Sequence, residues 1–170
     1  PTAPAPELLM DGKRKNRATC ETALAAAETG HLVLTTLHTK DAAQSISRIL
    51  DMFPLEERDS IRKSISECLQ AIVCQRLAPR AIGQGVVPIN EILINTSIVK
   101  KLIFDNQLEK VPQAIAGGEE EGMMSFNQCL LKLAKNGDIT EETALKFSDT
   151  PQQLQMNLKG IFLSSGGIIQ

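Results

Sequence analysis

Tryptophan and tyrosine are absent from this chain of 170 residues, and phenylalanine occurs only five times. The core must then be built from Leu, Ile, Val, Ala and Met, which suits helices packed on a sheet better than an aromatic-rich β-sandwich. The length permits one domain with a full core, or a domain with a small appendage. The composition therefore favours an α/β protein.

Paired cysteines, net charge and long apolar runs are also scarce. No C-x-x-C pair occurs among the four cysteines, so the sequence indicates free thiols in a reducing cytosol rather than a zinc site or a disulfide framework. The formal net charge of −2 provides no general attraction to nucleic acid or to an anionic membrane. No apolar run is long enough to cross a bilayer, and the first residues do not have the charged-then-apolar pattern of a signal peptide. We expect a cytoplasmic protein with no metal and no nucleic-acid partner.

The first 94 residues alternate between the two-residue period of strands and the 3.6-residue period of helices. Thr19 is expected to cap the first helix and Gly30 to end it, while Thr39 is expected to cap the second helix, which stops before Pro54. The predicted elements are a strand at 8–10, a helix at 19–29, a strand between 31 and 38, helices at 39–53 and from about 55 to 73, and a hairpin of strands at 74–80 and 86–94.

Everything after Asn95 has the pattern of short helices. Thr96 or Ser97 begins the first of them, Thr140 is the expected cap of the fourth, and Pro151 occupies the first position of the last. The second and third helices are predicted around residues 108–115 and 123–135. We therefore place a boundary near Asn95, between a sheet-bearing half and an all-helical half.

His31 and His38 bracket the apolar run 32–37, which predicts a buried strand. In an open α/β sheet, ligands gather beyond the carboxyl ends of the strands, so His38, Thr39 and Lys40 are candidate site residues. The two histidines are seven positions apart, so a regular strand would place them on opposite faces, where they could not hold one metal ion together. A histidine at a strand end is more often a hydrogen-bonded structural residue than a functional one, and the residues alone leave both interpretations open.

Glu91 is a carboxylate on a face of the second hairpin strand that is otherwise apolar. Arg76, on the first hairpin strand, is its expected partner in a structural ion pair. The sequence contains no Gly-x-x-x-x-Gly-Lys-Ser/Thr phosphate loop, no Gly-x-Ser-x-Gly elbow and no His-Glu-x-x-His helix. Direct motifs therefore indicate no catalytic residue.

Several separate segments nevertheless resemble one family in the right order. The longest is AETGHLVLTTLHTKDAAQSISRILDMFP at residues 27–54, followed by SECLQAIVCQRL at 66–77, then by residues 91–93, 95–96 and 122–133. Together they resemble the PilT/PilU-like type IV pilus retraction motors of the secretion ATPase superfamily, over about residues 19–150. The first segment is similar to the histidine-containing box of these ATPases.

The resemblance implies the C-terminal part of a RecA-like ATPase core followed by a small all-helical domain. Members of this family form hexameric rings of identical subunits at the cytoplasmic face of the inner membrane, contact a pilus platform protein, and hydrolyse ATP with Mg²⁺ for pilus retraction and twitching motility. In that family the histidine box lies beside the nucleotide, so His31, His38 and the adjacent Thr39 are the implied nucleotide-proximal residues. The implied divisions are a degenerate or disordered 1–18, a partial core at 19–94, a helical domain at 95–160 and an apolar tail at 161–170.

The sequence departs from the family at two motifs. The Walker B segment falls on LLMDGKRKN at residues 8–16, where Lys13 occupies the place of the catalytic glutamate, and no Walker A loop is present. A lysine cannot polarise an attacking water as a carboxylate does. A second motif, in the helical domain, has lost its arginines at residues 99–104. We expect the isolated chain to be inactive, and interpret it as the C-terminal part of a motor from an incomplete reading frame.

Two other interpretations remain open from the sequence. The apolar tail at 161–170 would suit a non-catalytic assembly module of a pilus or type II secretion motor. A small α/β domain with an unrelated ligand is the third. The histidine box alone does not distinguish a motor that retracts pili from one that extends them.

Overall fold

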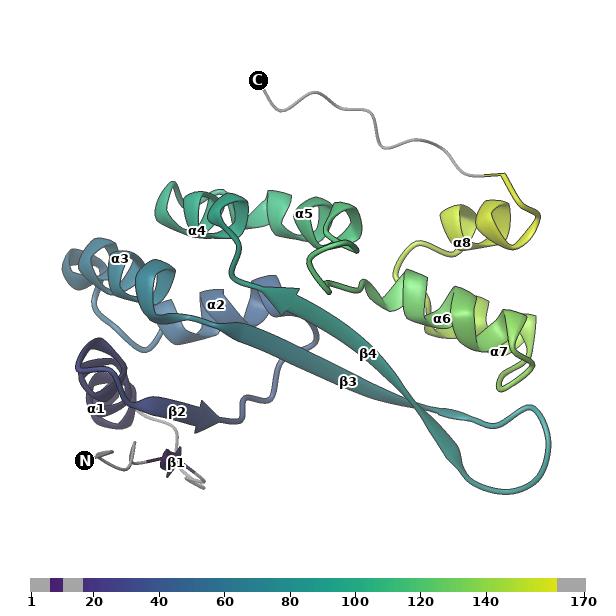
Figure 1. Cartoon of the computed structure of the whole chain (residues 1–170), viewed down its shortest axis with the longest axis horizontal. Coiled ribbons are helices and arrows are strands. Elements are labelled where there is room, and N and C mark those ends of the chain that lie inside the picture. The colour runs from purple at the N-terminus through teal and green to yellow at the C-terminus, as the bar shows by residue number, and fades with distance from the viewer. Residues whose placement is uncertain (1–6, 11–16, 162–170) are drawn as a thin grey trace, which may run out of the picture. The chain divides into compact units, whose positions relative to one another are not determined.

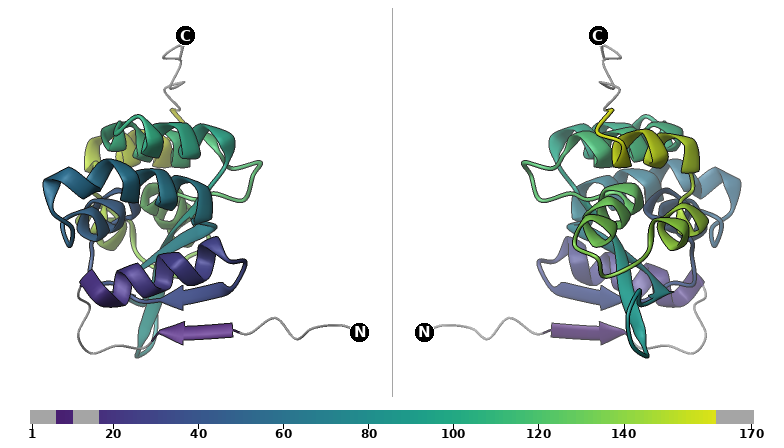
Figure 2. Two further views of the ribbon diagram at one scale, coloured as in Figure 1. Left: turned by 90° about the vertical axis from the view of Figure 1, so that its left-hand side faces the viewer. Right: turned by 90° about the vertical axis from the view of Figure 1, so that its right-hand side faces the viewer.

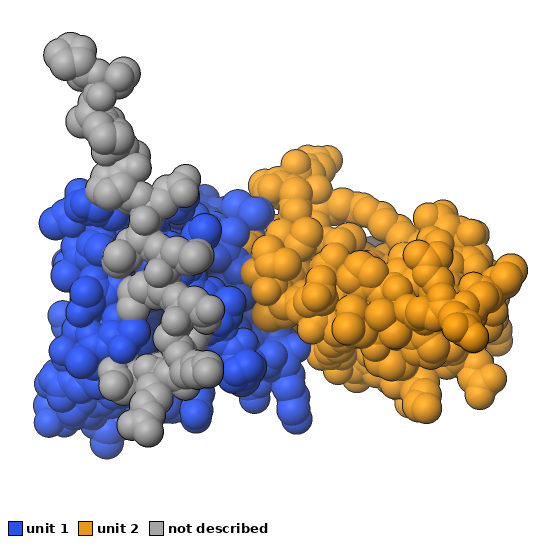
Figure 3. Space-filling model, turned by 90° about the horizontal axis from the view of Figure 1, so that it is seen from below, with its two compact units in different colours: residues 1–72, 94–111 blue, residues 73–93, 112–170 orange. Residues whose placement is uncertain are grey.

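The computed structural model describes residues 7–10 and 17–161 of the chain (Figure 1). The predictions for Lys13 and for the tail beyond Ile161 lie outside these residues. The described chain contains helices and strands in mixed order, and it divides into two compact units (Figure 3). Unit 1 comprises residues 1–72 and 94–111, and unit 2 comprises residues 73–93 and 112–170.

A two-stranded parallel sheet lies in unit 1. Strand β1 (Glu7–Met10) pairs with β2 (Leu32–Thr35), and Met10 lies opposite Thr35. Helix α1 (Arg17–Glu28) connects the two strands and packs beside β2 (Figure 2). A parallel pair requires such a crossover connection, which the alanine-rich sequence supplies. The strand predicted at residues 8–10 is confirmed.

Two helix starts in unit 1, those of α1 and of the next helix, differ from the predictions. Helix α1 begins at Arg17, two residues before the predicted cap Thr19, although Gly30 does adopt the left-handed conformation expected after the helix, with φ of 86°. Helix α2 (Ala42–Leu50) is capped by Asp41, whose carboxylate accepts a hydrogen bond from the Gln44 backbone N–H at 2.8 Å. The prediction of Thr39 as this cap is therefore wrong, because a carboxylate closer to the helix takes that position.

The remaining helices of unit 1 surround a small apolar core. The long helix predicted from residue 55 is split into a 3₁₀ turn, η1 (Leu55–Glu57), and α3 (Arg58–Cys68), and α4 (Ser97–Phe104) follows with the predicted Thr96 as its cap. A second 3₁₀ turn, η2 (Leu108–Lys110), contacts α2. The buried apolar residues here are Ala42, Ile46, Leu50, Phe53, Ile65, Val99, Leu102, Ile103 and Val111.

Unit 2 combines the predicted hairpin with the last four helices. Strands β3 (Ala71–Pro79) and β4 (Val86–Ile94) are hydrogen-bonded to each other, and Gly83 and Gly85 in their turn have positive φ. The four helices are α5 (Val111–Gly117), α6 (Phe126–Lys135), α7 (Glu141–Phe147) and α8 (Pro151–Leu158). Thr140 caps α7 and Pro151 opens α8, which confirms both predictions.

One face of β4 supplies much of the core of unit 2. Val87, Ile89 and Leu93 are buried on it, and Glu91 is 7% exposed among them, as the alternation of the sequence predicts. Helix α6 begins at Phe126 rather than at the predicted Met123, because Ser125 and Gln128 form a reciprocal capping box. The hairpin thus belongs to the same compact unit as the helices that follow it. The domain boundary near Asn95 stays a prediction.

Within the described ranges, no helix combines the length and the apolar character required to span a bilayer.

Candidate functional site

The carboxyl end of the parallel sheet is the region where the sequence predicts a ligand. Because Met10 pairs with Thr35, the two strands end side by side. The chain then runs from Thr36 to Asp41 and enters α2, whose first backbone N–H groups form the positive end of a helix dipole. This is the edge at which open α/β sheets bind ligands.

His31 lies at the opposite, amino-terminal end of β2. Its Nδ1 atom is 3.0 Å from the Thr29 hydroxyl and 3.2 Å from the Ala26 carbonyl oxygen, both on the last turn of α1 or just after it. The ring is half-buried. These contacts fix the ring against the end of α1, which is the hydrogen-bonded structural environment that the sequence left open.

His38, Thr39 and Lys40 lie in the loop between β2 and α2. The strand ends at Thr35, so the prediction that it extends to His38 is wrong, and the two-residue period of a strand does not relate His31 to His38. His38 is exposed. The Thr39 hydroxyl lies 2.6 Å from that of Ser45, and the Lys40 backbone N–H donates to Gln44 Oε1 at 2.7 Å, which ties the loop to the first turn of α2.

The strand between the histidines is not buried as predicted. Leu32 and Leu34 are 47% and 52% exposed, because the described sheet has only two strands and offers β2 no second neighbour. Beside β2 lies a groove of about 940 Å³ that α1 and the end of α3 also line. We call this hollow the β2 groove. Its lining residues are Thr19, Cys20, Ala23, Leu24, Ala27, Glu28, Gly30, His31, Leu32, Val33, Leu34, Thr35, Leu37, Ile49, Ile65, Glu67, Cys68, Leu69, Gln70 and Ala71.

All four cysteines are free thiols, and Cys20 and Cys68 line this groove. Burial raises the pKa of the Cys68 thiol, and the charges of Glu28 and Glu67 raise it further, while Lys100 opposes them. Cys68 is therefore a poor nucleophile at neutral pH. In the ranges 7–10 and 17–161 no group of three or more His, Cys, Asp or Glu residues could hold a metal ion.

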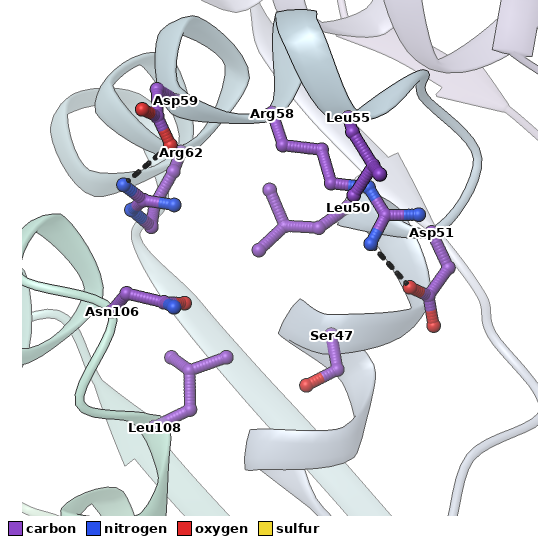
Figure 4. Close-up of a pocket in the computed structure, with 9 residues that line it drawn as sticks. All are labelled: Ser47, Leu50, Asp51, Leu55, Arg58, Asp59, Arg62, Asn106 and Leu108. Carbon is purple, nitrogen blue, oxygen red and sulfur yellow. Dashed lines mark hydrogen bonds and ion pairs between the residues drawn. The ribbon is translucent and has the colours of Figure 1, made fainter.

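A smaller pocket of about 320 Å³ lies between α2, α3 and η2 (Figure 4). Arg58 pairs with Asp51 at 3.1 Å, and Arg62 pairs with Asp59 at 2.8 Å. Each guanidinium also donates through Nε to a backbone carbonyl oxygen, that of Phe53 for Arg58 and that of Phe104 for Arg62. Because each arginine is already neutralised by a carboxylate, the pocket is a weak candidate for an anion site.

The sequence pattern gave no indication of the pocket around Arg58 and Arg62. Their spacing of four residues indicates only that they share one helix face. The carbonyl of Phe104 lies 42 positions beyond Arg62. No local pattern could reveal that contact.

Arg76 forms a cluster whose observed contacts the sequence did not predict. Its guanidinium makes two hydrogen bonds to the Asp149 carboxylate, at 3.0 and 2.9 Å, donates to the Phe147 carbonyl oxygen at 3.2 Å, and stacks 3.9 Å from the centre of the Phe126 ring. The predicted ion pair between Arg76 and Glu91 stays a prediction. Asp149 and Phe126 were missed because they follow Arg76 by many tens of residues.

Comparison with known proteins places these features in a wider context. The sequence model of the family described as "Type II/IV secretion system protein" matches residues 4–128. Type IV pilus ATPase PilU of Pseudomonas aeruginosa is 36% identical over 155 residues, which cover 91% of this chain and 41% of PilU. The retraction ATPase PilT of the same organism is 38% identical over 147 residues, which cover 86% of this chain and 42% of PilT.

Solved structures agree with the sequence comparison. The pilus retraction motor PilT with bound ADP is 43% identical with a TM-score of 0.72, covering 85% of this chain and 40% of the PilT chain. The Legionella pneumophila ATPase DotB is 27% identical with a TM-score of 0.69, covering 82% and 37%. The predicted fold class, an α/β ATPase core followed by helices, is thereby confirmed. The chain spans about two fifths of the length of these relatives.

Proposed function

Because this chain belongs to the family of type II/IV secretion system proteins, we propose that it is part of an ATP-driven motor that retracts type IV pili. The observation that carries the proposal is the similarity to PilU and PilT over 91% and 86% of the chain. The likeness to the solved PilT retraction motor favours retraction over extension. Identical motor subunits in a hexameric ring and a platform protein at the inner membrane are the proposed partners.

ATP with Mg²⁺ is the proposed nucleotide, in keeping with the ADP in the PilT structure. Its hydrolysis would supply the free energy for movement. His38 and Thr39 are the proposed nucleotide-proximal residues because they lie beyond the carboxyl end of β2 and before the amino end of α2, where backbone N–H groups attract phosphate. His31 is proposed to act with them by positioning the start of β2, through its contacts with Thr29 and Ala26.

The isolated chain is proposed to be inactive. Its sequence contains no phosphate loop, and Lys13 occupies the place of the family's catalytic glutamate. An ammonium group has no lone pair with which to accept a proton from an attacking water. The residues of this chain would therefore act only together with the phosphate-binding part of a motor.

An exchange of segments tests this proposal. The 147-residue segment of Pseudomonas aeruginosa PilT that is similar to this chain is replaced by the corresponding residues of the chain, with PilT's own Walker B residues kept. The chimaera is assayed for ATP turnover and for twitching in a strain without PilT. We expect both activities, and we expect His38→Ala to lower kcat at least about tenfold, or ~1.4 kcal/mol. Lys146→Ala, an exposed change in α7, should leave kcat unchanged.

A folded chimaera without ATP turnover would contradict the motor function. The isolated chain serves as a second assay: hydrolysis by it that disappears on His38→Ala would show that the chain needs no further part. Circular dichroism and size-exclusion chromatography separate loss of activity from loss of folding.

The assembly module remains the second candidate. The tail that suggested it lies outside the described residues except for Ile161, whose side chain is 51% exposed. Light scattering on the chain with and without residues 161–170 distinguishes the two, because an unchanged monomer in both cases removes its support.

A further inference from the structure

The pocket between α2, α3 and η2 has an uncovered apolar side (Figure 4). Leu50, Leu55 and Leu108 line it, and the side chain of Leu55 is 77% exposed. The volume of about 320 Å³ is at the lower end of the range of ligand pockets, and every lining residue belongs to unit 1. An apolar side chain of a ligand would remove this leucine surface from water.

The charged groups of the pocket cancel one another. Arg58 pairs with Asp51 at 3.1 Å. Arg62 pairs with Asp59 at 2.8 Å. Among the described residues that line the pocket, no other side chain is charged. A charged ligand would lose its hydration without gaining an unpaired counter-charge, so the pocket favours a ligand that carries no charge.

Hydrogen-bond donors nevertheless surround the leucines. A guanidinium has five N–H donors. Arg58 uses Nε for the carbonyl oxygen of Phe53, in addition to its carboxylate partner. Arg62 uses Nε for the carbonyl oxygen of Phe104 in the same way. The other N–H groups, together with the amide of Asn106, suit the uncharged carbonyl oxygens of a peptide.

The tail at residues 161–170 is a peptide segment with this chemistry. Its sequence, IFLSSGGIIQ, contains five large apolar residues and no charged side chain. Serines and glycines separate its apolar clusters, at 161–163 and 168–169. Ile161, where the described chain ends, is 51% exposed, so unit 2 leaves half of this side chain uncovered. Such a segment gains free energy when its apolar side chains leave water.

We propose that the pocket lined by Leu50, Leu55 and Leu108 binds the tail, residues 161–170, of a second copy of this chain. The tail follows α8 in unit 2, whereas the pocket belongs to unit 1, so each copy offers a tail to one neighbour and a pocket to another. Head-to-tail contacts of this kind repeat around a ring of identical subunits. The contact rests on the assembly of identical subunits proposed above.

Binding is measured between the full chain and a tail presented separately. Residues 161–170 are fused to the carboxyl end of a soluble carrier protein, which is immobilised. The full chain carries Phe162→Asp, so that its own tail does not compete. We expect a Kd of about 0.1 mM or lower, because the contact buries only a few apolar side chains. The carrier without the tail should not bind.

Two exposed apolar residues provide a matched pair of variants. Leu55 is 77% exposed and lines the pocket, whereas Ile82 is 86% exposed and lies outside the lining. Leu55→Lys should raise the Kd at least about tenfold, and Ile82→Lys should change it less than about twofold. Circular dichroism checks that both variants fold.

Asn106→Gly tests the same pocket without disturbing the backbone. Asn106 has a positive φ of 56°, which glycine adopts without strain. The change removes only the side-chain amide, and it should raise the Kd about threefold or more. An unchanged Kd would contradict the placement of the tail beside this residue.

Charges placed in the tail separate this contact from an ion site. Leu163→Glu and Leu163→Lys in the carrier-borne tail should both raise the Kd at least about tenfold, because the arginines and carboxylates of the pocket already neutralise one another. Tighter binding of either variant would show an electrostatic site and overturn the proposal.

Other results would also overturn it. Equal effects of Leu55→Lys and Ile82→Lys would show that the tail does not enter this pocket. A Kd raised by Leu34→Lys but not by Leu55→Lys would place the tail in the β2 groove. In light scattering, a full chain that stays monomeric above the measured Kd would exclude a second copy. These assays contain no nucleotide, so their failure is distinguishable from failure of the proposed motor function.

Discussion

Replacing Arg76 should destabilise unit 2 more than any other single charge removal on the hairpin. The side chain is 24% exposed and joins β3 to the connection between α7 and α8 through Asp149 and the Phe147 carbonyl oxygen. It also lies against the ring of Phe126, the first residue of α6. Arg76→Ala removes all of these contacts at once.

The expected magnitude follows from the exposure of each partner. Asp149 is 64% exposed, so its pair with Arg76 contributes about 0.5–1 kcal/mol. The hydrogen bond to Phe147 contributes about 1 kcal/mol. The stacking on Phe126 contributes a further 0.5–1 kcal/mol, roughly, as a cation–π contact. Arg76→Ala should thus lower the free energy of unfolding by about 2–3 kcal/mol, and Arg76→Lys by about half as much, because an ammonium lacks the planar fork.

Hydrogen exchange measured for each helix is the appropriate assay, because it reports unit 2 separately from unit 1. Protection should fall in α6, α7 and α8 and stay unchanged in α3. Arg80→Ala is the matched control, since Arg80 is an exposed arginine of the same hairpin and should cost less than about 0.5 kcal/mol. Equal costs for Arg76→Ala and Arg80→Ala would refute the assignment of the cluster.

The same measurement examines the predicted pair with Glu91. Glu91 is 7% exposed, so an ion pair there would couple the two residues by about 1–3 kcal/mol in a double-mutant cycle of Arg76→Ala and Glu91→Gln. Additive effects of the two changes would contradict that pair.

Two further predictions concern unit 1. Asn95 Nδ2 donates to the carbonyl oxygens of Ser66 and Leu69, at 2.9 and 2.8 Å. Asn95→Asp replaces this donor by a carboxylate, so it should lower the free energy of unfolding by about 2–4 kcal/mol in a urea titration. A loss below ~1 kcal/mol would contradict this prediction. Because the pKa of the Cys68 thiol is raised, the pH at which its alkylation rate is half-maximal should lie above that of an ordinary thiol. Glu67→Gln removes a negative charge that opposes the thiolate, so it should lower this pH and speed alkylation at pH 8. An unchanged rate would refute the contribution of Glu67 to the raised pKa.

Local patterns predicted the elements of the fold well where the physical cause was itself local. Thr140 and Pro151 begin helices because a hydroxyl and a fixed φ act within a single turn. The alternation of β4 correctly placed Glu91 on the buried face. Thr39 failed as a cap because Asp41, two residues later, competes for the same backbone donors. Which of the two residues caps the helix depends on where the backbone enters the helical conformation, and the sequence pattern does not fix that position.

The candidate site was predictable only as a segment. The order of motifs around His31 and His38 indicated the family, which the comparisons confirm. The position of each side chain was not predictable, because β2 ends at Thr35 and leaves His38 in a loop. Their role beside a nucleotide stays a proposal.

Sequence alone determined the family, the order of helices and strands, and the face on which Glu91 is buried, since these depend on short-range periodicity and on motifs. Only the tertiary structure decided that Leu32 and Leu34 remain half exposed, because burial depends on how many strands flank β2. It likewise decided that Arg76 meets Asp149, which is 73 positions away. Contacts at such separations depend on how the whole chain packs, and no local pattern encodes them.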